Sequence, residues 1–330
     1  MSTLSNLQIF QDEVYLSTTE LVAEQIALFN EATRGCIGLI PGGNTQGDFL
    51  KEAYWGLISG LVRRRDPDDR SSTVSAVNIS QLLKTSVKIA AGTPPINIDP
   101  DTLRWINKDP EEYAMVIAEQ LAPAMLKDML GSCLTSFISA VRSADNGDGI
   151  YIRNITNGAD TGVATYRELN NTAKLFGDRA EMISCWVIHS TPMFGLWDNA
   201  LQNSAQLFVY GDVSVRMDPF GRPFVMTDMS QLVASGSPDG YYTLGLVPGA
   251  IACQQNNDYE DNLDTSNGKE NISRTFQAQW TYTIGVKGFQ WTDGSAPRAP
   301  TDAELATEGN WTQIATSNKD TGGVILLSDG

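Results

Sequence analysis

The chain has 330 residues, of which 42% are hydrophobic and 19% are charged, and these proportions are typical of a folded protein with a sizeable core. The net charge of -16 makes the average surface acidic, which does not favour simple adsorption to nucleic acid or to anionic membranes. Composition therefore argues against a disordered chain and against a basic nucleic-acid-binding protein, and the length allows one large domain or two to three smaller ones.

Residues 1–47 are predicted to form a leading arm. The letters S-T-T-E at Ser17 match a capping box, so we expect a helix from there to about Gly35, with Val22 and Ile26 on its apolar side. The following letters, C-I-G-L-I-P-G-G-N-T-Q-G, are too rich in glycine and proline for a regular element and too apolar for a free linker. This part of the arm is expected to lie as an irregular strap over another surface.

Residues 48–92 are predicted to form an extended loop, which is a long two-stranded hairpin. Strand-like runs over 49–62 and 73–92 flank the charged joint R-R-R-D-P-D-D-R. A helix from Ser80 is the alternative for the second run. A two-stranded hairpin has almost no core of its own, so a neighbouring subunit is expected to hold it.

The extended loop carries the candidate assembly contacts, which are Arg63, Arg64, Arg65, Arg70 and Trp55. The adjacent arginines form a cationic tip in a strongly acidic chain, and acidic surface on a neighbouring subunit is therefore the expected partner. The alternative is a solubilising turn whose arginines face water.

Residues 109–143 are predicted to form one long spine helix. Asp109 suits the cap, Pro110 suits the first helical position, and the glycines of D-N-G-D-G after Arg142 end the helix. Pro123 is expected to kink the helix without ending it. The apolar residues follow two lines, so we expect the helix to be covered on two sides; they are Ile117, Leu121 and Met125, and Leu126, Leu130, Leu134, Phe137 and Val141.

From residue 147 to 253 the pattern predicts alternating short strands and helices. Thr165 is expected to cap a helix that runs through Phe176, and Ser190 is expected to begin a second one that runs through Leu201. Strands are predicted over 147–158 with a turn, and at 183–188, 213–217, 224–228, 241–247 and 250–253. The letters D-P-F-G-R-P should turn the third of these strands back into the fourth.

The last part of the chain contains the clearest strand. Apolar residues alternate without a fault from Phe276 to Val286, which predicts one core face and one polar face. The acidic stretch 256–271 is expected to be an exposed loop, and A-P-R-A-P-T-D at 296–302 a flexible joint. Residues 323–327 supply a last short strand.

No catalytic residue, cofactor site or metal site is predicted. The single histidine, His189, lacks a nucleophile elbow nearby, and the chain has no phosphate loop and no dinucleotide-binding glycine pattern. The letters D-N-G-D-G at Asp145 lack the spaced acids of a calcium loop and indicate a turn. The acidic loop could bind a cation weakly, although a solvated loop is the commoner structure.

The four cysteines are far apart in sequence and lack the spacing of a metal or redox motif, so free thiols in a reducing compartment are expected. The first residues lack a basic region followed by an apolar core. No apolar run is judged to approach the length of a membrane span. We therefore expect a protein made in the cytosol, with no membrane partner.

The order of arm, hairpin, spine helix, inserted α/β unit and long strand resembles the major capsid proteins of tailed bacteriophages, of the Hong Kong 97 type. The most similar residues are V-I-H-S-T-P-M-F-G-L-W-D at Val187, G-R-P-F-V-M-T-D at Gly221 and Y-T-I-G-V-K-G-F-Q-W at Tyr282. The resemblance implies an α+β fold with the arm at 1–47, the extended loop at 48–92, a peripheral domain at 93–160 and 254–330, and an axial α/β domain at 161–253.

The resemblance also implies a function. It implies a subunit that self-assembles, through pentamers and hexamers, into the icosahedral shell that encloses the double-stranded DNA of a phage without sequence-specific binding. A scaffolding protein and a portal are implied partners, with assembly in the host bacterial cytoplasm and final residence in the virion. Some relatives crosslink a loop lysine; Lys84 and Lys88 lie in the extended loop, with no signal that either reacts.

Two alternatives remain open from the sequence. An encapsulin-type shell protein of a bacterial nanocompartment would share the fold, and DNA in purified particles would disfavour it. A soluble hydrolase that uses His189 and Ser190 belongs to a different class, and loss of an activity in His189→Ala would support it.

Overall fold

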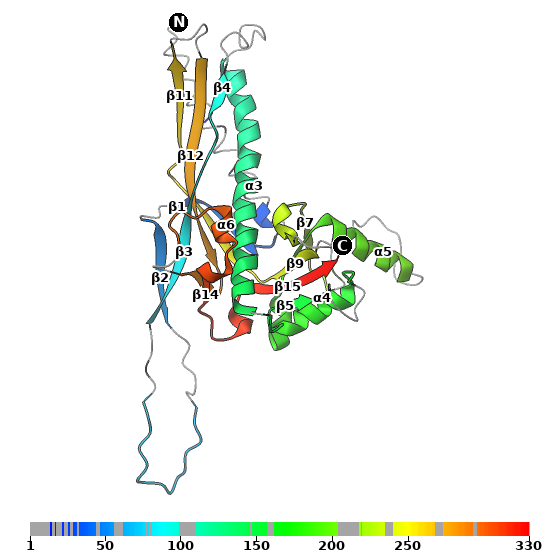
Figure 1. Ribbon diagram of the computed structural model, residues 1–330. Coiled ribbons are helices and arrows are strands. Elements are labelled where there is room, and N and C mark those ends of the chain that lie inside the picture. The colour runs from blue at the N-terminus through cyan, green and yellow to red at the C-terminus, as the bar shows by residue number, and fades with distance from the viewer. Residues whose placement is uncertain are drawn as a thin grey trace.

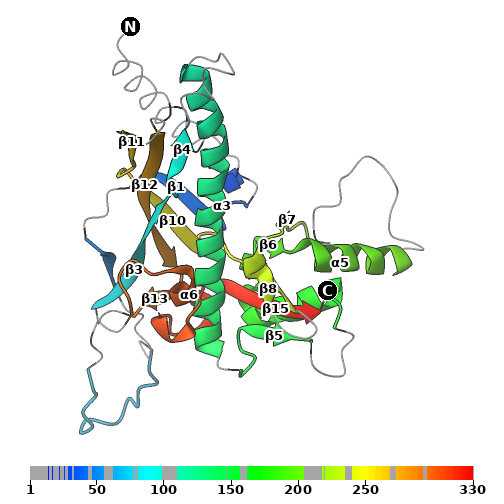
Figure 2. The same ribbon diagram turned by 45° about the horizontal axis from the view of Figure 1, so that its top comes forward.

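Two β-sheets and one long helix organise the molecule, in which the helix α3 stands between the two sheets (Figures 1 and 2). α3 contacts β12 and β10 of the larger sheet and β15 and β5 of the smaller one. The computed structural model describes residues 14, 17, 22, 26, 29–31, 33–43, 47–55, 62–76, 78, 81–98, 110–145, 147–156, 162–203, 218, 220–234, 240–267, 273–292 and 296–329.

The larger sheet has seven strands and is built on β12, against which β10, β3, β4 and β11 all pair. The path through the sheet runs β1-β10-β12-β3-β2, and every pairing is antiparallel except that of β1 with β10. The strands are β1 (Ile37–Gly43), β2 (Phe49–Trp55), β3 (Gln81–Gly92), β4 (Ile96–Ile98), β10 (Ile251–Asn256), β11 (Glu260–Ser266) and β12 (Ser273–Val286).

The smaller sheet has six strands in the order β5-β15-β9-β6-β7, with β8 paired to β9. Its strands are β5 (Ile152–Asn154), β6 (Cys185–Ile188), β7 (Phe224–Met226), β8 (Val233–Ala234), β9 (Gly240–Leu246) and β15 (Gly323–Asp329). The helices α4 (Tyr166–Ala173) and α5 (Ser190–Asn203) belong to this part of the chain (Figure 1). β13 (Phe289–Trp291) and β14 (Trp311–Gln313) form a separate antiparallel pair.

The spine helix is confirmed as α3 (Pro110–Asp145), which runs without interruption through Pro123. The predicted cap Asp109 lies outside the described residues, and the kink at Pro123 stays a prediction. At the other end, the Asp145 carboxylate accepts hydrogen bonds from the backbone N–H groups of Tyr151 (2.7 Å) and Ile152 (3.1 Å). The stretch after the helix is therefore a turn closed by Asp145, as expected, and it leads directly into β5.

Burial along α3 confirms that the helix is covered on two sides in its second half. Leu134, Phe137 and Val141 are fully buried, together with small residues that the sequence analysis did not single out. Leu126 and Leu130, which were expected in the core, are only partly buried. Over Val116–Asp145 the helix is long and apolar enough to cross a membrane, contrary to expectation, but 67% of its most apolar stretch is buried within the protein. A helix buried to this extent is typical of the core of a folded domain.

The long alternating strand is confirmed as β12. Every second side chain from Phe276 to Val286 is buried, as the pattern predicts. The opposite face is polar and exposed at Gln277 and Gln279 but becomes buried at Thr283. The second half of β12 is therefore covered on both faces.

Two stretches that were expected to be irregular are strands. Residues 37–43 form β1, which pairs in parallel with β10 and shifts register between Ile40 and Gly43. β1 lies at an edge of the sheet, where a proline and a register shift are tolerated. Residues 260–266, expected in an exposed loop, form β11 along the full register from Glu260↔Gln279 to Ser266↔Ser273. Acidic residues are compatible with an edge strand because one of its sides faces water.

The base of the extended loop is a hairpin, in which β2 and β3 pair from Phe49↔Val87 to Trp55↔Gln81. The alternative of a helix from Ser80 is wrong for Gln81–Gly92, which is a strand. The strands are shorter than expected, because residues 62–76 are described without strand structure. These residues pack on no core that would stabilise a longer ladder.

The leading helix ends near Gly35, as expected. Gly35 has a φ of 70°, and its N–H donates to the Asn30 carbonyl at 3.0 Å. Its predicted start at Ser17 is wrong, because Val14 is already helical. The Asn30 side chain also donates to and accepts from the backbone of Leu39, at 2.7 Å and 2.9 Å, and so fixes the helix to β1.

The predicted elements between residues 147 and 253 are confirmed where the structure describes them. Thr165 caps α4 by accepting from the Glu168 N–H, and Ser190 begins α5. The turn before β7 is closed by hydrogen bonds between Asp218 and Arg222 and between Gly221 and Asp218. The strand predicted at 213–217 lies outside the described residues, so its hairpin with β7 is untested.

At the C-terminal side, β15 confirms the last predicted strand. The expected flexible joint ends in a short helix, α6 (Asp302–Leu305), which a capping box of Thr301 and Glu304 begins. Short 3₁₀ helices occur at Lys174–Met182, Ser230–Leu232, Glu308–Asn310 and Asn318–Asp320, and the first of them is kinked at Gly177.

Candidate assembly surfaces

The tip of the extended loop, residues 62–76, is exposed at every position. Arg63, Arg64, Arg65 and Arg70 lie in it, and none of the four makes an ion pair with the part of the chain that the structure describes. The tip has local order: the Asp69 carboxylate accepts from the N–H groups of Ser71 (2.9 Å) and Ser72 (3.1 Å). The hydrogen bond from the Ser72 side chain lowers the pKa of Asp69 most, and those from the two N–H groups act in the same direction, so the charged form of Asp69 is favoured in this turn.

The hairpin base anchors this tip to the sheet. Lys84 lies opposite Glu52 in the register of β2 and β3; burial lowers the pKa of the Lys84 amine, and the Glu52 charge partly offsets this. Lys88 forms an ion pair with Asp258 at 3.5 Å. Trp55 ends β2 and pairs with Gln81, but its side chain lies outside the description, so its role as a contact stays a prediction.

A second surface is the free side of β11, which we call the acidic edge. β11 pairs through one side with β12, and no described strand pairs with its other side. Glu260 and Asp264 of this strand are exposed, and the Glu260 carboxylate accepts from the Gln279 side chain of β12 at 2.9 Å. The acidic edge and the loop tip lie at opposite ends of the molecule (Figures 1 and 2). A contact between them therefore requires two copies of the chain.

The acidic edge was missed in the sequence because E-D-N-L-D-T-S shows no alternation of apolar and polar residues. Its strand structure follows from its position beside β12, whose pattern is clear. The one available signal was the cluster of acidic residues itself, which suggests an exposed site without indicating a strand.

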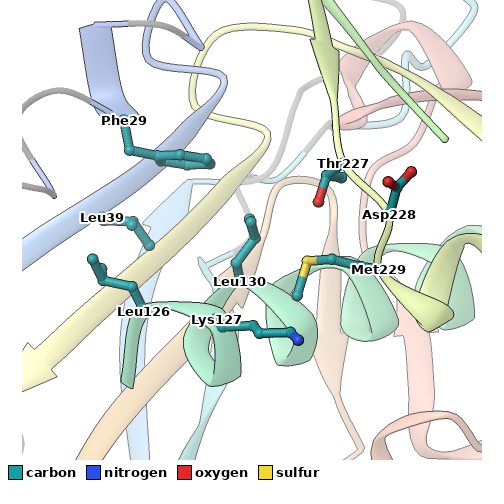
Figure 3. A pocket seen from close by; sticks show the side chains of 8 residues that line it. All are labelled: Phe29, Leu39, Leu126, Lys127, Leu130, Thr227, Asp228 and Met229. Atoms are coloured by element: carbon teal, nitrogen blue, oxygen red, sulfur yellow. The ribbon is translucent and has the colours of Figure 1, made fainter. Parts of the chain in front are cut away.

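A third surface feature is a pocket of about 310 Å³ between the leading helix, β1, α3 and the segment after β7. Figure 3 shows Phe29 and Leu39 at the left, Leu126 and Leu130 on α3 at the bottom, and Met229 at the right. Lys127, Thr227 and Asp228 complete its lining. The pocket explains why Leu126 and Leu130 are only partly buried, since both side chains form its wall.

Residues 6–325 match the profile of the family described as Major capsid protein 13-like. The chain belongs to this family.

Solved phage structures share the fold of this capsid protein at low sequence identity. A structure from Mycobacterium phage Bobi is 10% identical with a TM-score of 0.54, over 88% of this chain and 89% of the other. The capsid of Myoviridae phage XM1 is 12% identical with a TM-score of 0.53, over 89% and 90%. The acidic stable capsid of Helicobacter pylori bacteriophage KHP30 is 10% identical with a TM-score of 0.52, over 91% and 88%. A comparison with curated proteins gives no match.

The α+β fold of the Hong Kong 97 type is therefore confirmed, and so is the prediction of a non-enzymatic shell subunit that resides in the virion. The encapsulin alternative is not favoured, because the family is one of major capsid proteins. Among the described residues, no group of three or more His, Cys, Asp and Glu side chains could hold a metal ion.

The geometry around His189 does not form a hydrolase site in this capsid protein. The His189 Nδ1 accepts from the Thr191 N–H at 3.2 Å, and its Nε2 lies 3.8 Å from the Asp228 carboxylate. Asp228 also accepts from the Ser190 N–H at 3.2 Å. His189 and Asp228 therefore hold the first turn of α5, and no hydrogen bond in the described structure joins the Ser190 hydroxyl to the imidazole.

Proposed function

We propose that this capsid protein forms an icosahedral shell of pentamers and hexamers in which the loop tip of one subunit binds the acidic edge of a neighbour. The observation that carries the proposal is the position of the two surfaces. Four arginines that form no ion pair with the described residues lie at one end of the molecule, and Glu260 and Asp264 are exposed at the other.

This placement favours a head-to-tail contact. The loop tip and the acidic edge lie at opposite ends of the subunit, so they cannot bind each other within one copy. Each subunit can therefore place its loop tip on one neighbour and receive the loop tip of another at its acidic edge. Repeated contacts of this heterologous kind close into rings when the rotation between subunits allows it. Rings of five and of six are the units that the proposed shell needs.

Charge supports the pairing and predicts its salt dependence. The net charge of -16 makes like subunits repel, so a cationic tip gives each subunit one attractive point of contact. Guanidinium groups bind carboxylates with two parallel hydrogen bonds, which also fixes the orientation of the partner. Exposed charges are screened within about 10 Å at 0.1 M salt, so assembly should slow as salt rises.

The two sheets support a division into domains. We propose that α3 and the seven-stranded sheet form the peripheral domain and that the six-stranded sheet with α4 and α5 forms the axial domain. β10 then belongs to the peripheral domain, although residues 251–253 were predicted to be axial. β5 and β15 belong to the axial domain, although their residues were predicted to be peripheral. The arm and the extended loop keep their predicted ranges and contribute β1, and β2 with β3, to the sheet of the peripheral domain.

Double-stranded DNA, a scaffolding protein and a portal are proposed as partners during assembly in the host cytoplasm. The acidic average surface supports retention of DNA by enclosure, because few phosphate contacts are then needed. The scaffold and portal rest on the family resemblance.

Charge reversal tests the docking surface. The variant Arg63→Glu/Arg64→Glu/Arg65→Glu should stay folded by circular dichroism and accumulate as unassembled subunits or capsomers. The matched control replaces the same three arginines by lysine, keeps the charge, and should assemble.

The reciprocal variant Glu260→Lys/Asp264→Lys should fail in the same way, and shells should form when both reversals are combined in one chain. Normal shells from the triple glutamate variant would refute the docking role while leaving the capsid function intact.

A further inference from the structure

The acidic edge presents backbone groups that no described strand uses, and β12 shows in which direction they point. The Ala278 N–H donates to the Thr93 hydroxyl at 2.9 Å, and the Ala278 carbonyl accepts from the Thr93 N–H at 2.8 Å. Both backbone groups of Ala278 therefore point toward β3 and away from β11. The Thr281 N–H points the other way, to the carboxylate of Asp258, which precedes β11 in the chain, at 2.9 Å.

The register of β11 against β12 then identifies the outward groups of β11. Residues that lie opposite each other in an antiparallel pair alternate between exchanging two backbone hydrogen bonds and exchanging none. Asp261 lies opposite Ala278, so this pair exchanges none, and Leu263 opposite Phe276, two residues further along, is of the same kind. The N–H and C=O of Leu263 therefore point to the acidic edge.

The side chains of β11 favour a cationic partner strand. Glu260, Asn262 and Asp264 are exposed on one face of the strand, and Leu263 on the other face is partly buried. A second copy of β11 would bring like charges together, which is destabilising across two strands. The Glu260 carboxylate accepts one hydrogen bond from Gln279, and since a carboxylate has about four acceptor sites it can still bind a guanidinium group.

Residues 62–65 of the loop tip are suited to be that partner. They have no regular secondary structure and carry three of the four arginines of the tip. The turns of the tip begin only after them, because the Asp66 carboxylate accepts from the Asp68 N–H at 3.0 Å and Asp69 holds the next turn. Val62 is 93% exposed, and its β-branched side chain suits a strand.

We propose that residues 62–65 of one subunit pair with the acidic edge of a neighbour as an additional antiparallel strand. This inference rests on the proposed contact between the loop tip and the acidic edge, and it adds backbone hydrogen bonds to the pairing of side chains. Val62 lies opposite Leu263 of the neighbour, and the two residues exchange two N–H···O=C hydrogen bonds. Main-chain bonds of this kind give affinity, and the side chains then give specificity.

The same register matches the charges. Arg65 lies opposite Glu260. Arg63 lies opposite Asn262, with Glu260 and Asp264 at the two diagonal positions, about 7 to 8 Å away and within reach of a long side chain. A parallel strand that starts from the same pair would carry Arg65 away from Glu260, and a shift by one residue would turn both arginines to the half-buried face of β11.

Hydrogen exchange of the full-length chain, as unassembled subunits and in shells, tests the backbone pairing. Peptides that cover residues 62–65 and Leu263 should exchange at least about tenfold more slowly in shells, since one good hydrogen bond corresponds to about this factor. Residues 73–76 of the same loop tip carry no cation and should exchange equally in both states. Equal exchange of residues 62–65 in both states, or protection of residues 73–76 in their place, would overturn the proposed strand.

A proline at position 62 separates the backbone from the charges. Val62→Pro removes the N–H that the pairing needs and keeps every arginine, so assembly should slow by about tenfold or more. The subunit should stay folded, because Val62 is exposed and proline suits an extended backbone. The matched control Val62→Thr keeps both the N–H and the β-branched shape and should assemble normally.

The two levels of the account fail in different ways. Normal assembly of Val62→Pro, together with failure of the triple glutamate variant, would show that the tip docks through its side chains alone; this would overturn the strand and leave the proposed contact intact. Normal assembly of the triple glutamate variant would refute the contact itself. Hydrogen exchange of the wild-type chain decides the question even if Val62→Pro fails to fold.

Discussion

Two leucines of α3 that differ in burial allow a test of the fold, because the same substitution by alanine can be made at both. Leu134 is fully buried where α3 is covered on both sides, and Leu130, one turn earlier, is partly buried and lines the open pocket. Substitution of each by alanine removes the same three carbon atoms from the same helix. A difference in the free energy of unfolding therefore reports only their surroundings.

The expected magnitudes differ by a factor of about two to four. Leu134→Ala loses the transfer free energy and leaves a closed cavity, which together cost about 2.7 to 5 kcal/mol. Leu130→Ala enlarges a pocket that is already open to solvent, so the cavity cost is largely absent. Three methylene-sized groups at about 0.8 kcal/mol each, discounted by half for partial exposure, give about 1.2 kcal/mol.

Urea unfolding of the unassembled subunit, followed by tryptophan fluorescence, measures both values. The slope with urea should stay constant, and the midpoint should fall much further for Leu134→Ala. Equal losses for the two variants would refute the assignment of Leu130 to a pocket wall. A negligible loss for Leu134→Ala would show that α3 is not covered on two sides.

Three further predictions concern single polar groups. Burial raises the pKa of Asp128, which accepts from the Tyr282 hydroxyl at 2.9 Å, so the folded state binds a proton more tightly than the unfolded state. Stability should fall as pH rises from the ordinary pKa of 3.8 toward the raised one, and Asp128→Asn should flatten this part of a pH series of urea unfolding curves. Asp145→Ala removes a charged acceptor from three backbone N–H groups and should cost about 1.5 to 3 kcal/mol in the same assay; an unchanged midpoint would contradict its role in closing the turn. His189→Ala should leave shell formation intact, as seen by electron microscopy, and its failure to assemble would show a role beyond holding α5.

Local sequence patterns predicted the elements in which one pattern of apolar residues repeats many times. The alternation from Phe276 to Val286 predicted β12 because one face of this strand is buried along its whole length. Capping residues and apolar periodicity predicted α3, since a long helix shows many turns of the same pattern. In both cases the sequence carries the information within the element itself.

Edge strands could not be predicted in this way. β11 consists mainly of polar residues and is a strand because β12 offers it a partner. β1 contains Pro41 and still pairs with β10, since the edge position tolerates a proline. In these strands the long-range pairing overrides the local propensity.

The candidate surfaces were predicted in part. The exposed arginines of the loop tip follow from charge and turn residues, which are local properties. The acidic edge and the pocket each combine segments far apart in sequence; the pocket, for example, forms only because the leading helix, β1, α3 and the segment after β7 lie side by side. Only the folded topology contains this information.

Cryo-electron microscopy of particles formed on co-expression with the scaffolding protein tests the central claim most directly. The account predicts closed shells in which residues 62–76 of each subunit lie against Glu260 and Asp264 of a neighbour. Failure to form shells, or shells in which the loop tip contacts its own subunit while both acidic residues face solvent, would contradict it.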